Sequence, residues 1–275
     1  MAALPVPRGR GRRAVLGSLA LAAVGTPIAI AQPWADAGTR AAPQPLWQPD
    51  PVKDGLRAFE GVEADRIGRH RDRRYVVVEG DRWRFNIWQD DRDSTGGGDR
   101  QRTEVKGMVS GGKPLKMRNN EIWRIAYELF IPATLHGTSR FTHIFQLKTP
   151  STNGGPWVTM SLGRSGGAER LRLRPFSTGG ADIGSADLAR LREHWISVEL
   201  TFRIGPKGSG RLVLRNGTGA GAPVVADSSR SGINIPDQGD YVRPKWGIYR
   251  SVESARTDIV DTHLLARNFR AFREG

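Results

Sequence analysis

The feature that most constrains the fold is a series of short segments in which apolar and polar residues alternate. The clearest spans residues 122–131, where every second position is apolar: Trp123, Ile125, Tyr127, Leu129 and Ile131. A period of two is typical of a β-strand with one buried face. Similar segments occupy residues 75–79, 82–88, 141–148, 157–162, 169–174, 195–204, 211–215 and 262–272. Only residues 186–194 read as a helix, and a short one.

The turns between these segments indicate how the strands pair. Gly80-Asp81 separates two of them and Asn216-Gly217 follows another, and such dipeptides favour hairpins. Residues 75–88 and 195–272 must pair across a long stretch of sequence if they share one domain. A jelly roll makes such pairings. We therefore predict an all-β fold, a two-sheet antiparallel β-sandwich of the concanavalin-like jelly-roll type.

Residues 1–31 have the features of an export signal. Four arginines precede an apolar run over residues 14–24, and Ala29-Ile30-Ala31 fits the small-residue pattern of a cleavage site. Cleavage after Ala35-Asp36-Ala37 is an alternative. The pair Arg12-Arg13 resembles a twin-arginine signal, but the Ser or Thr before the pair and the Phe after it are missing. We expect a secreted, extracellular protein, exported through the twin-arginine route or the general one.

Composition predicts one folded domain after the signal. Residues 32–54 begin with a stretch rich in Ala, Pro and Gln and read as a linker, whereas residues 55–275 contain no segment that would divide them. Hydrophobic residues make up 38% of the chain, which is enough for a packed core. Because the chain has no cysteine, it has neither disulfides nor thiolate metal ligands, and its core alone must stabilise it.

The charge of the chain favours an anionic partner. Removal of residues 1–31 takes away four arginines and no acid, so that the net charge falls from +14 to +10. A basic exported protein attracts polyanions over long range, although a general bias toward arginine would also produce this charge. We expect an acidic polysaccharide substrate, no nucleic acid, no stable membrane association after signal removal, and a monomer.

Residues 243–250 form the strongest candidate strand for a functional site. Alternation places Lys245, Gly247 and Tyr249 on one face, and Trp246 and Ile248 on the other. The apolar pair can anchor the strand in a core. The opposite face offers a cation, a gap at glycine and a phenol with Arg250 beside it, which suits holding an anionic ligand against a proton-transfer group. A solvated strand face is the alternative.

A second candidate strand covers residues 100–107. Arg102, Glu104 and Lys106 share one face there. Glu104 can hold Arg102 in place and leave guanidinium donors free for a substrate carboxylate. A surface ladder of ion pairs is the alternative reading.

A third candidate strand covers residues 141–148. Gln146 and Lys148 share a face and could bind an acidic sugar. His143 should point with Phe145 and Leu147 toward the core, unless a bulge redirects it. A buried, hydrogen-bonded histidine is the expected outcome.

The sequence offers no strong metal site. The five histidines lack metal-ligand spacing. Asp90, Asp91, Asp93 and Asp99 could bind calcium loosely, but a solvated acidic loop is the expected reading because their spacing is not that of a calcium hand.

The order Arg-x-Glu, Gln-x-basic and Lys-x-Gly-x-Tyr resembles the jelly-roll polysaccharide lyases: alginate lyases, the heparin-lyase-I-like group and, nearest on these features, glucuronan lyases. Their motifs are Arg-(Ser/Thr)-Glu-Leu, Gln-Ile-His and Tyr-Phe-Lys-Ala-Gly-x-Tyr. This chain has Arg102-Thr103-Glu104-Val105, Gln146-Leu147-Lys148 and the segment 243–249. The resemblance covers residues 55–272. Lys148 replaces the family's histidine, and Arg243 replaces its first tyrosine, with Tyr241 two positions earlier.

The resemblance implies cleavage of a uronate-containing polysaccharide by β-elimination, which leaves unsaturated uronate ends. Gln146 and Arg102 would neutralise the uronate carboxylate, and Tyr249 would protonate the leaving oxygen. The base is open among Tyr249, His143 and Lys148. No cofactor is implied with certainty, and calcium stays open. The remaining groups expected to bind substrate or support the site are Glu104, Lys148, Lys245, Arg250, Tyr241 and Arg243.

Two other functions compete with the lyase. One is a carbohydrate-binding jelly roll without catalysis, since a fold does not fix a function. The other is a glycoside hydrolase, which needs two carboxylates that flank the bond. No Glu-x-Asp-x-x-Glu pattern occurs in the chain, so the hydrolase is the weaker alternative.

Overall fold

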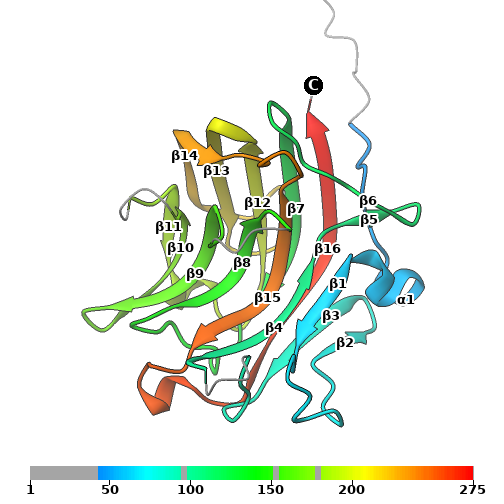
Figure 1. The fold of residues 1–275 in the computed structure, drawn as a ribbon. Coiled ribbons are helices and arrows are strands. Elements are labelled where there is room, and N and C mark those ends of the chain that lie inside the picture. Colours follow the sequence, from blue (N-terminus) through cyan, green and yellow to red (C-terminus); the bar gives the residue numbers. More distant parts are fainter. Residues whose placement is uncertain (1–42, 94–97, 151–154, 177–180, 275) are drawn as a thin grey trace, which may run out of the picture. The chain divides into compact units, whose positions relative to one another are not determined.

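A computed structural model describes residues 43–93, 98–150, 155–176 and 181–274. Two seven-stranded antiparallel sheets dominate them (Figure 1). The first sheet contains, in spatial order, β1 (Gly61–Ala64), β4 (Arg100–Lys106), β15 (Arg243–Ser251), β8 (Thr142–Lys148), β9 (Val158–Ser165), β10 (Ala168–Pro175) and β11 (Gly184–Asp187). The second contains β14 (Val224–Ile235), β13 (Gly205–Arg215), β12 (Trp195–Arg203), β7 (Ile122–Phe130), β16 (Thr262–Glu274), β3 (Arg82–Ile87) and β2 (Val76–Glu79).

The remaining elements are small. β5 (Val109–Ser110) and β6 (Lys113–Pro114) form a two-stranded sheet. The helices are single turns: α1 (Pro51–Asp54), η1 (Gly55–Ala58), η2 (Leu188–Leu191) and η3 (Arg256–Asp258). In the part of the chain that the structure describes, no helix is long and apolar enough to cross a membrane. The predicted export signal, residues 1–31, lies outside the described residues.

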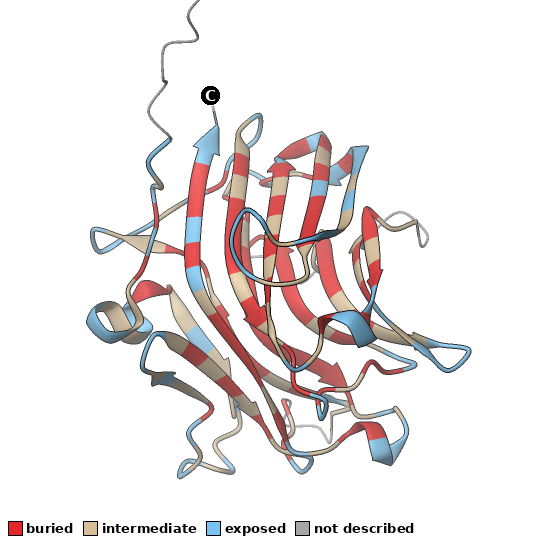
Figure 2. Ribbon diagram, turned by 180° about the vertical axis from the view of Figure 1, so that it is seen from behind, coloured by how far each residue is buried: buried red, intermediate tan, exposed pale blue. Residues whose placement is uncertain are grey.

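The two large sheets pack face to face through their apolar sides. Phe145 of β8 stacks on Phe202 of β12 with ring centroids 6.2 Å apart, and Trp246 of β15 meets Phe269 of β16 at 5.0 Å. Buried and less buried residues alternate along the long strands of the second sheet (Figure 2). This arrangement confirms the predicted two-sheet sandwich.

The predicted strands are present, with ends shifted by a few residues. Gly80-Asp81 joins β2 to β3, as expected. Asn216-Gly217 opens the connection between β13 and β14, but that connection continues to residue 223 and is therefore longer than a two-residue turn. β16 pairs with both β3 and β7, which is the predicted long-range closure of the sandwich.

Two expectations are wrong. Residues 186–194 are not a helix: their first part completes β11, which pairs with β10, and only η2 is helical. The predicted linker, residues 32–54, is part of the fold where the structure describes it. Trp47 is 2% exposed, stacks on Trp246 at 5.5 Å and pairs with Ala271. One buried tryptophan outweighs the linker-like composition around it.

An irregularity in β8 decides the geometry of the site. The pairing of β8 with β9 shifts between His143 and Phe145, which makes Ile144 an extra residue on β8. Ile144 and Phe145 are consecutive, yet both are buried in the core. The bulge therefore breaks the alternation and turns His143 to the face opposite the core.

Candidate active site

Five residues form a row across the first sheet, each on a neighbouring strand. Backbone pairing places Arg102 opposite Tyr249, Tyr249 opposite His143, His143 opposite Ser161, and Ser161 opposite Arg172. Since neighbouring strands lie about 4.8 Å apart, the row spans about 20 Å. It places a phenol and an imidazole side by side, with a guanidinium at each end.

His143 is held by three neighbours. Its ring stacks on Phe141 with centroids 4.7 Å apart, and lies 6.0 Å from the ring of Tyr249. Its Nδ1 forms a 2.7 Å hydrogen bond with Ser161 Oγ. Burial lowers the pKa of His143 to about 4, so the imidazole is neutral at physiological pH. A bulge was the alternative considered for His143 in the sequence. It is present, and it places His143 in the row and not in the core.

Ser161 determines which ring nitrogen of His143 carries the proton. Its hydroxyl donates to Thr159 Oγ1 at 3.4 Å, and it can then accept the Nδ1–H of His143. In that tautomer the lone pair of the neutral ring is on Nε2. His143 therefore offers a lone pair that can accept a proton.

Tyr249 lies between two arginines of β4. The Cζ atom of Arg102 is 3.8 Å from the centroid of the tyrosine ring, and Arg100 Nη1 donates to the phenol oxygen at 3.2 Å. Phe141 also packs against the ring of Tyr249, with centroids 5.2 Å apart. The phenol is fixed in orientation, and positive charge surrounds it.

Arg102 belongs to a compact square of alternating charges. Lys245 Nζ contacts Glu104 at 2.7 Å and Glu63 at 2.8 Å, and Arg102 Nη1 contacts the same two carboxylates at 2.8 and 3.0 Å. Burial alone would raise the pKa of Glu104, but Lys245 and Arg102 outweigh that effect and hold its pKa below the usual value. Asp93 adds a third carboxylate, 3.1 Å from Arg102 Nε.

This square changes the role that the sequence predicted for Arg102. Glu104 does contact Arg102, as predicted, but the arginine is shared among three carboxylates and is largely buried. Its Nε and Nη1 donors are engaged within the protein, which leaves fewer of them for a substrate carboxylate than we expected. The square is also no surface ladder, because Glu104 and Lys245 are 1% and 4% exposed.

Gln146 and Lys148 share the face of the row, as alternation predicted. Gln146 Nε2 donates to Glu104, which attaches the amide to the charge square. Lys148 is half-buried beside it. Burial, and then the charges of Lys245 and Arg102, lower the pKa of Lys148. Gln146 is opposite Lys245 and lies nearer the row, whereas Lys148 is opposite Arg243, five residues along β8 from His143 and therefore far from the row.

Three predicted substrate-binding residues are not brought to the row. Arg250 is 0% exposed on the opposite face of β15, where it donates to Gln101 at 2.6 Å and to the Val260 carbonyl at 2.8 Å. Alternation excludes it from the face of Tyr249, and its assignment to substrate is wrong. Arg243 and Tyr241 both bind Glu60, near the other end of β15 and about 20 Å along the strand from Tyr249.

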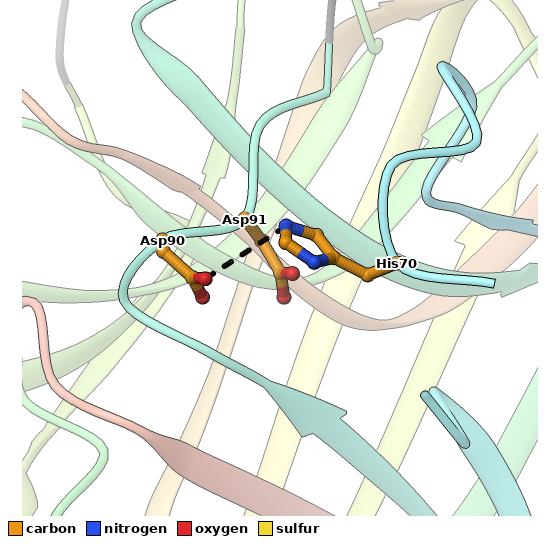
Figure 3. A group of neighbouring side chains, drawn as sticks. All are labelled: His70, Asp90 and Asp91. Atoms are coloured by element: carbon orange, nitrogen blue, oxygen red, sulfur yellow. Dashed lines mark ion pairs between the residues drawn. The ribbon is translucent and has the colours of Figure 1, made fainter. Parts of the chain in front are cut away.

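The acidic loop is solvated only in part: Asp90 is exposed, as predicted, but two of its neighbours are not. Asp91 and Asp93 are 4% and 5% exposed. His70, Asp90 and Asp91 come close enough to hold a cation (Figure 3), but Arg73 Nη1 already lies 2.7 Å from both carboxylates. The Asp91 carboxylate also accepts from Tyr75 and the Trp88 amide. These donors fit an arginine-paired cluster and do not fit a calcium site.

A cavity of about 450 Å³ opens beside His143. Its lining includes Phe141, Ser161 and three arginines of β10, namely Arg170, Arg172 and Arg174. Alternation over residues 169–174 predicts this strand, but these arginines were not among the predicted site residues. Their spacing of two residues was the signal that could have found them.

No protein-family model matches the chain, and no curated protein matches it. Among solved structures, an endo-β-1,4-glucuronan lyase from the fungus Trichoderma reesei is similar over 83% of this chain and 95% of its own, with a TM-score of 0.50 and 12% identity. An alginate lyase from Pseudomonas aeruginosa matches 74% of this chain and 89% of its own, with a TM-score of 0.48 and 18% identity. An alginate lyase from a Chlorella virus matches 84% and 100%, with a TM-score of 0.46 and 11% identity. At such identities the likeness bears on fold alone, and the chain has the jelly-roll fold of the polysaccharide lyases.

Proposed function

We propose that this protein is a secreted polysaccharide lyase that cleaves an acidic, uronate-containing polysaccharide by β-elimination. The observation that carries the proposal is the pairing of His143 with Tyr249 on the sheet face opposite the core, with ring centroids 6.0 Å apart, beside the cavity that His143 lines. A neutral imidazole and a phenol at this separation supply a base and an acid to one bound sugar. The jelly-roll fold and the basic charge of the chain agree with this function.

In the proposed reaction His143 Nε2 removes the proton from C5 of the uronate. The electron pair of the broken C–H bond forms the C4–C5 double bond, and the C4–O bond to the leaving sugar breaks. Tyr249 donates its phenolic proton to that oxygen. His143 is preferred over Lys148 as the base because it is neutral, directly opposite Tyr249 in the sheet, and held by Ser161.

The carboxylate of the reacting sugar must be neutralised before C5 becomes acidic enough. We assign this task to the amide of Gln146, the next polar side chain on the face of His143, while Lys148, opposite Arg243 at the far end of β8, adds positive charge at a greater distance. Arg102 has the different task of holding the ring of Tyr249, since three carboxylates already match its charge. Arg100 fixes the phenol oxygen.

The test is the release of unsaturated uronate, followed by its ultraviolet absorbance, from glucuronan, alginate, heparin and hyaluronan. Turnover is expected on at least one of them. Tyr249→Phe and His143→Ala should each lower it by about a hundredfold or more, the usual contribution of a general acid or base. Absence of product on all four substrates, from protein shown to be folded, would reject the proposal.

A second candidate function is carbohydrate binding without catalysis. It is favoured by the charge square, in which Glu104 engages both Arg102 and Gln146. Titration of a polyuronate against the wild type and Tyr249→Phe separates the two functions. A lyase loses turnover and largely keeps binding in the variant, whereas a binding protein has no turnover to lose.

A further inference from the structure

The cavity beside His143 is a trough that follows the hairpin of β9 and β10. Its floor is β9, whose lining includes the small residues Thr159, Ser161 and Gly163. One side is formed by Phe141 and His143, and the other by β10. Since β8 and β10 are two strands apart, the two sides are separated by about 10 Å.

Three arginines line the β10 side. Arg170, Arg172 and Arg174 alternate with Leu171 and Leu173, which are fully buried in the core. The arginines therefore share the face of the trough, about 6.7 Å apart along the strand. They form what we call the arginine wall.

The arginine wall has more positive charge than its neighbours neutralise. Asp182 lies 2.8 Å from Arg172 and 3.7 Å from Arg174, and Arg170 donates to Ser185 at 2.9 Å. Among the described residues, the three guanidinium groups thus have one carboxylate partner, which contacts two of them. Two further arginines line the trough and are matched by acids: Arg140 by Glu253, and Arg164 by Glu169 and Asp258.

The wall lies at a fixed position relative to the reacting groups. Arg172 is opposite Ser161, which is opposite His143. A sugar that presents its C5 to His143 therefore has a neighbouring sugar over the floor of β9, with the wall beyond it. Phe176, at one end of the trough, is 60% exposed and offers a flat ring on which a sugar can pack.

We propose that the trough binds the sugar next to the reacting one, and that the arginine wall requires an acidic group on it. The protein would then select polymers with an acidic group on consecutive sugars over polymers that alternate acidic and neutral sugars. This inference rests on the proposed function, because it takes His143 as the position of the reacting sugar. Guanidinium groups bind carboxylates through paired, charge-assisted hydrogen bonds.

The test compares two tetrasaccharides by calorimetry in the Tyr249→Phe protein, which keeps the ligand intact. One probe is a glucuronan tetrasaccharide, with four acidic sugars, and the other is a hyaluronan tetrasaccharide, with two. The glucuronan probe is expected to bind at least about tenfold more tightly, the usual effect of one charge-assisted contact. Replacing Arg170, Arg172 and Arg174 by Gln should remove that preference.

A matched control removes three arginine charges from the second sheet, away from the trough. Arg203, Arg211 and Arg230 are exposed on β12, β13 and β14 of the second sheet. Their triple replacement by Gln should leave the preference intact. If the triple variant of the wall fails to fold, Arg170→Gln alone serves, because Arg170 is exposed and has no acidic partner among the described residues. A preference of several fold should then be lost.

Equal binding of the two probes, or a preference that survives loss of the wall, would overturn the inference. Its failure differs from failure of the lyase proposal. Turnover on a polyuronate with binding independent of the wall rejects only the inference. Tight binding that depends on the wall, without turnover of any polyuronate by the wild type, rejects the lyase and keeps the trough as a site for consecutive acidic sugars.

Discussion

The guanidinium of Arg102 lies over the ring of Tyr249, with Cζ 3.8 Å from the ring centroid. The same arginine bridges Glu63, Asp93 and Glu104. Arg102 therefore connects the charge square to Tyr249, the proposed acid. Glu63, Glu104 and Lys245 support the ring of Tyr249 without contacting it themselves.

Arg102→Met should destabilise the protein strongly. The change leaves Glu104 buried with one cationic partner fewer, and breaking a buried ion pair costs about 3–5 kcal/mol. Urea unfolding at pH 7 measures the loss. The double variant Arg102→Met/Glu104→Gln should recover part of it, because the unmatched charge is gone. A loss below about 1 kcal/mol in the single variant would show that solvent reaches the square.

His143 and Lys148 make opposite predictions as bases. If His143 removes the proton, His143→Ala should lower kcat by about a hundredfold or more. Lys148→Ala should lower kcat by less than about tenfold and act mainly on KM, since Lys148 would only attract the carboxylate. Steady-state kinetics on the best polyuronate decides between them. The reverse pattern would make Lys148 the base.

Ser161→Ala should change kcat rather than KM. The hydroxyl holds Nδ1 of His143 at 2.7 Å and does not form the arginine wall. Without it the imidazole can take either tautomer and turn on Phe141. We expect a decrease in kcat of about tenfold. Ser161→Thr retains a hydroxyl and should restore part of the rate, an outcome that a merely structural role of Ser161 would not require.

The strands, the sandwich and two of the five residues of the row, Arg102 and Tyr249, follow from the sequence because alternation is a local property. Spacing alone put Arg102 with Glu104, Gln146 with Lys148, and Tyr249 with Lys245, each set on one face of its own strand. His143 could not, because a bulge is decided by how β8 packs between two neighbours, and one extra residue reverses the face. Arg250 shows the converse error, since the same alternation should have excluded it from the face of Tyr249.

The ion-pair partners of the charged residues could not be predicted from the sequence for another reason. Glu63 and Glu60 are far in sequence from Lys245 and Arg243, and no local pattern marks them. Trp47 was lost within a linker-like composition, although it stacks on Trp246. Such contacts depend on long-range topology, which spacing along one strand does not contain.

The pKa of His143 predicts a stability change between pH 6.5 and about pH 4. Burial lowers the pKa from 6.5 to about 4 in the folded protein, so in this window the unfolded chain binds more protons than the folded one. Stability therefore falls as the pH decreases through it. Urea unfolding at pH 7 and pH 5 should show a smaller difference in His143→Gln than in the wild type. The comparison isolates His143, because the pKa of half-buried His263 is lowered too and changes both proteins alike.

Gly247→Ala should disrupt the strand that carries Tyr249. Gly247 has a φ of +133°, and a Cβ there would lie 2.1 Å from the carbonyl oxygen of Thr103. Strand β15 would have to move away from β4, at a cost of more than about 2 kcal/mol. Thermal and urea unfolding measure it. Gly163→Ala on β9 is the control, since a Cβ at Gly163 meets nothing within 4 Å. Because β15 holds Tyr249 against Arg102, the Gly247 variant should also lose activity under conditions where it remains folded, whereas equal stability of the two variants would mean that β15 and β4 are farther apart than described.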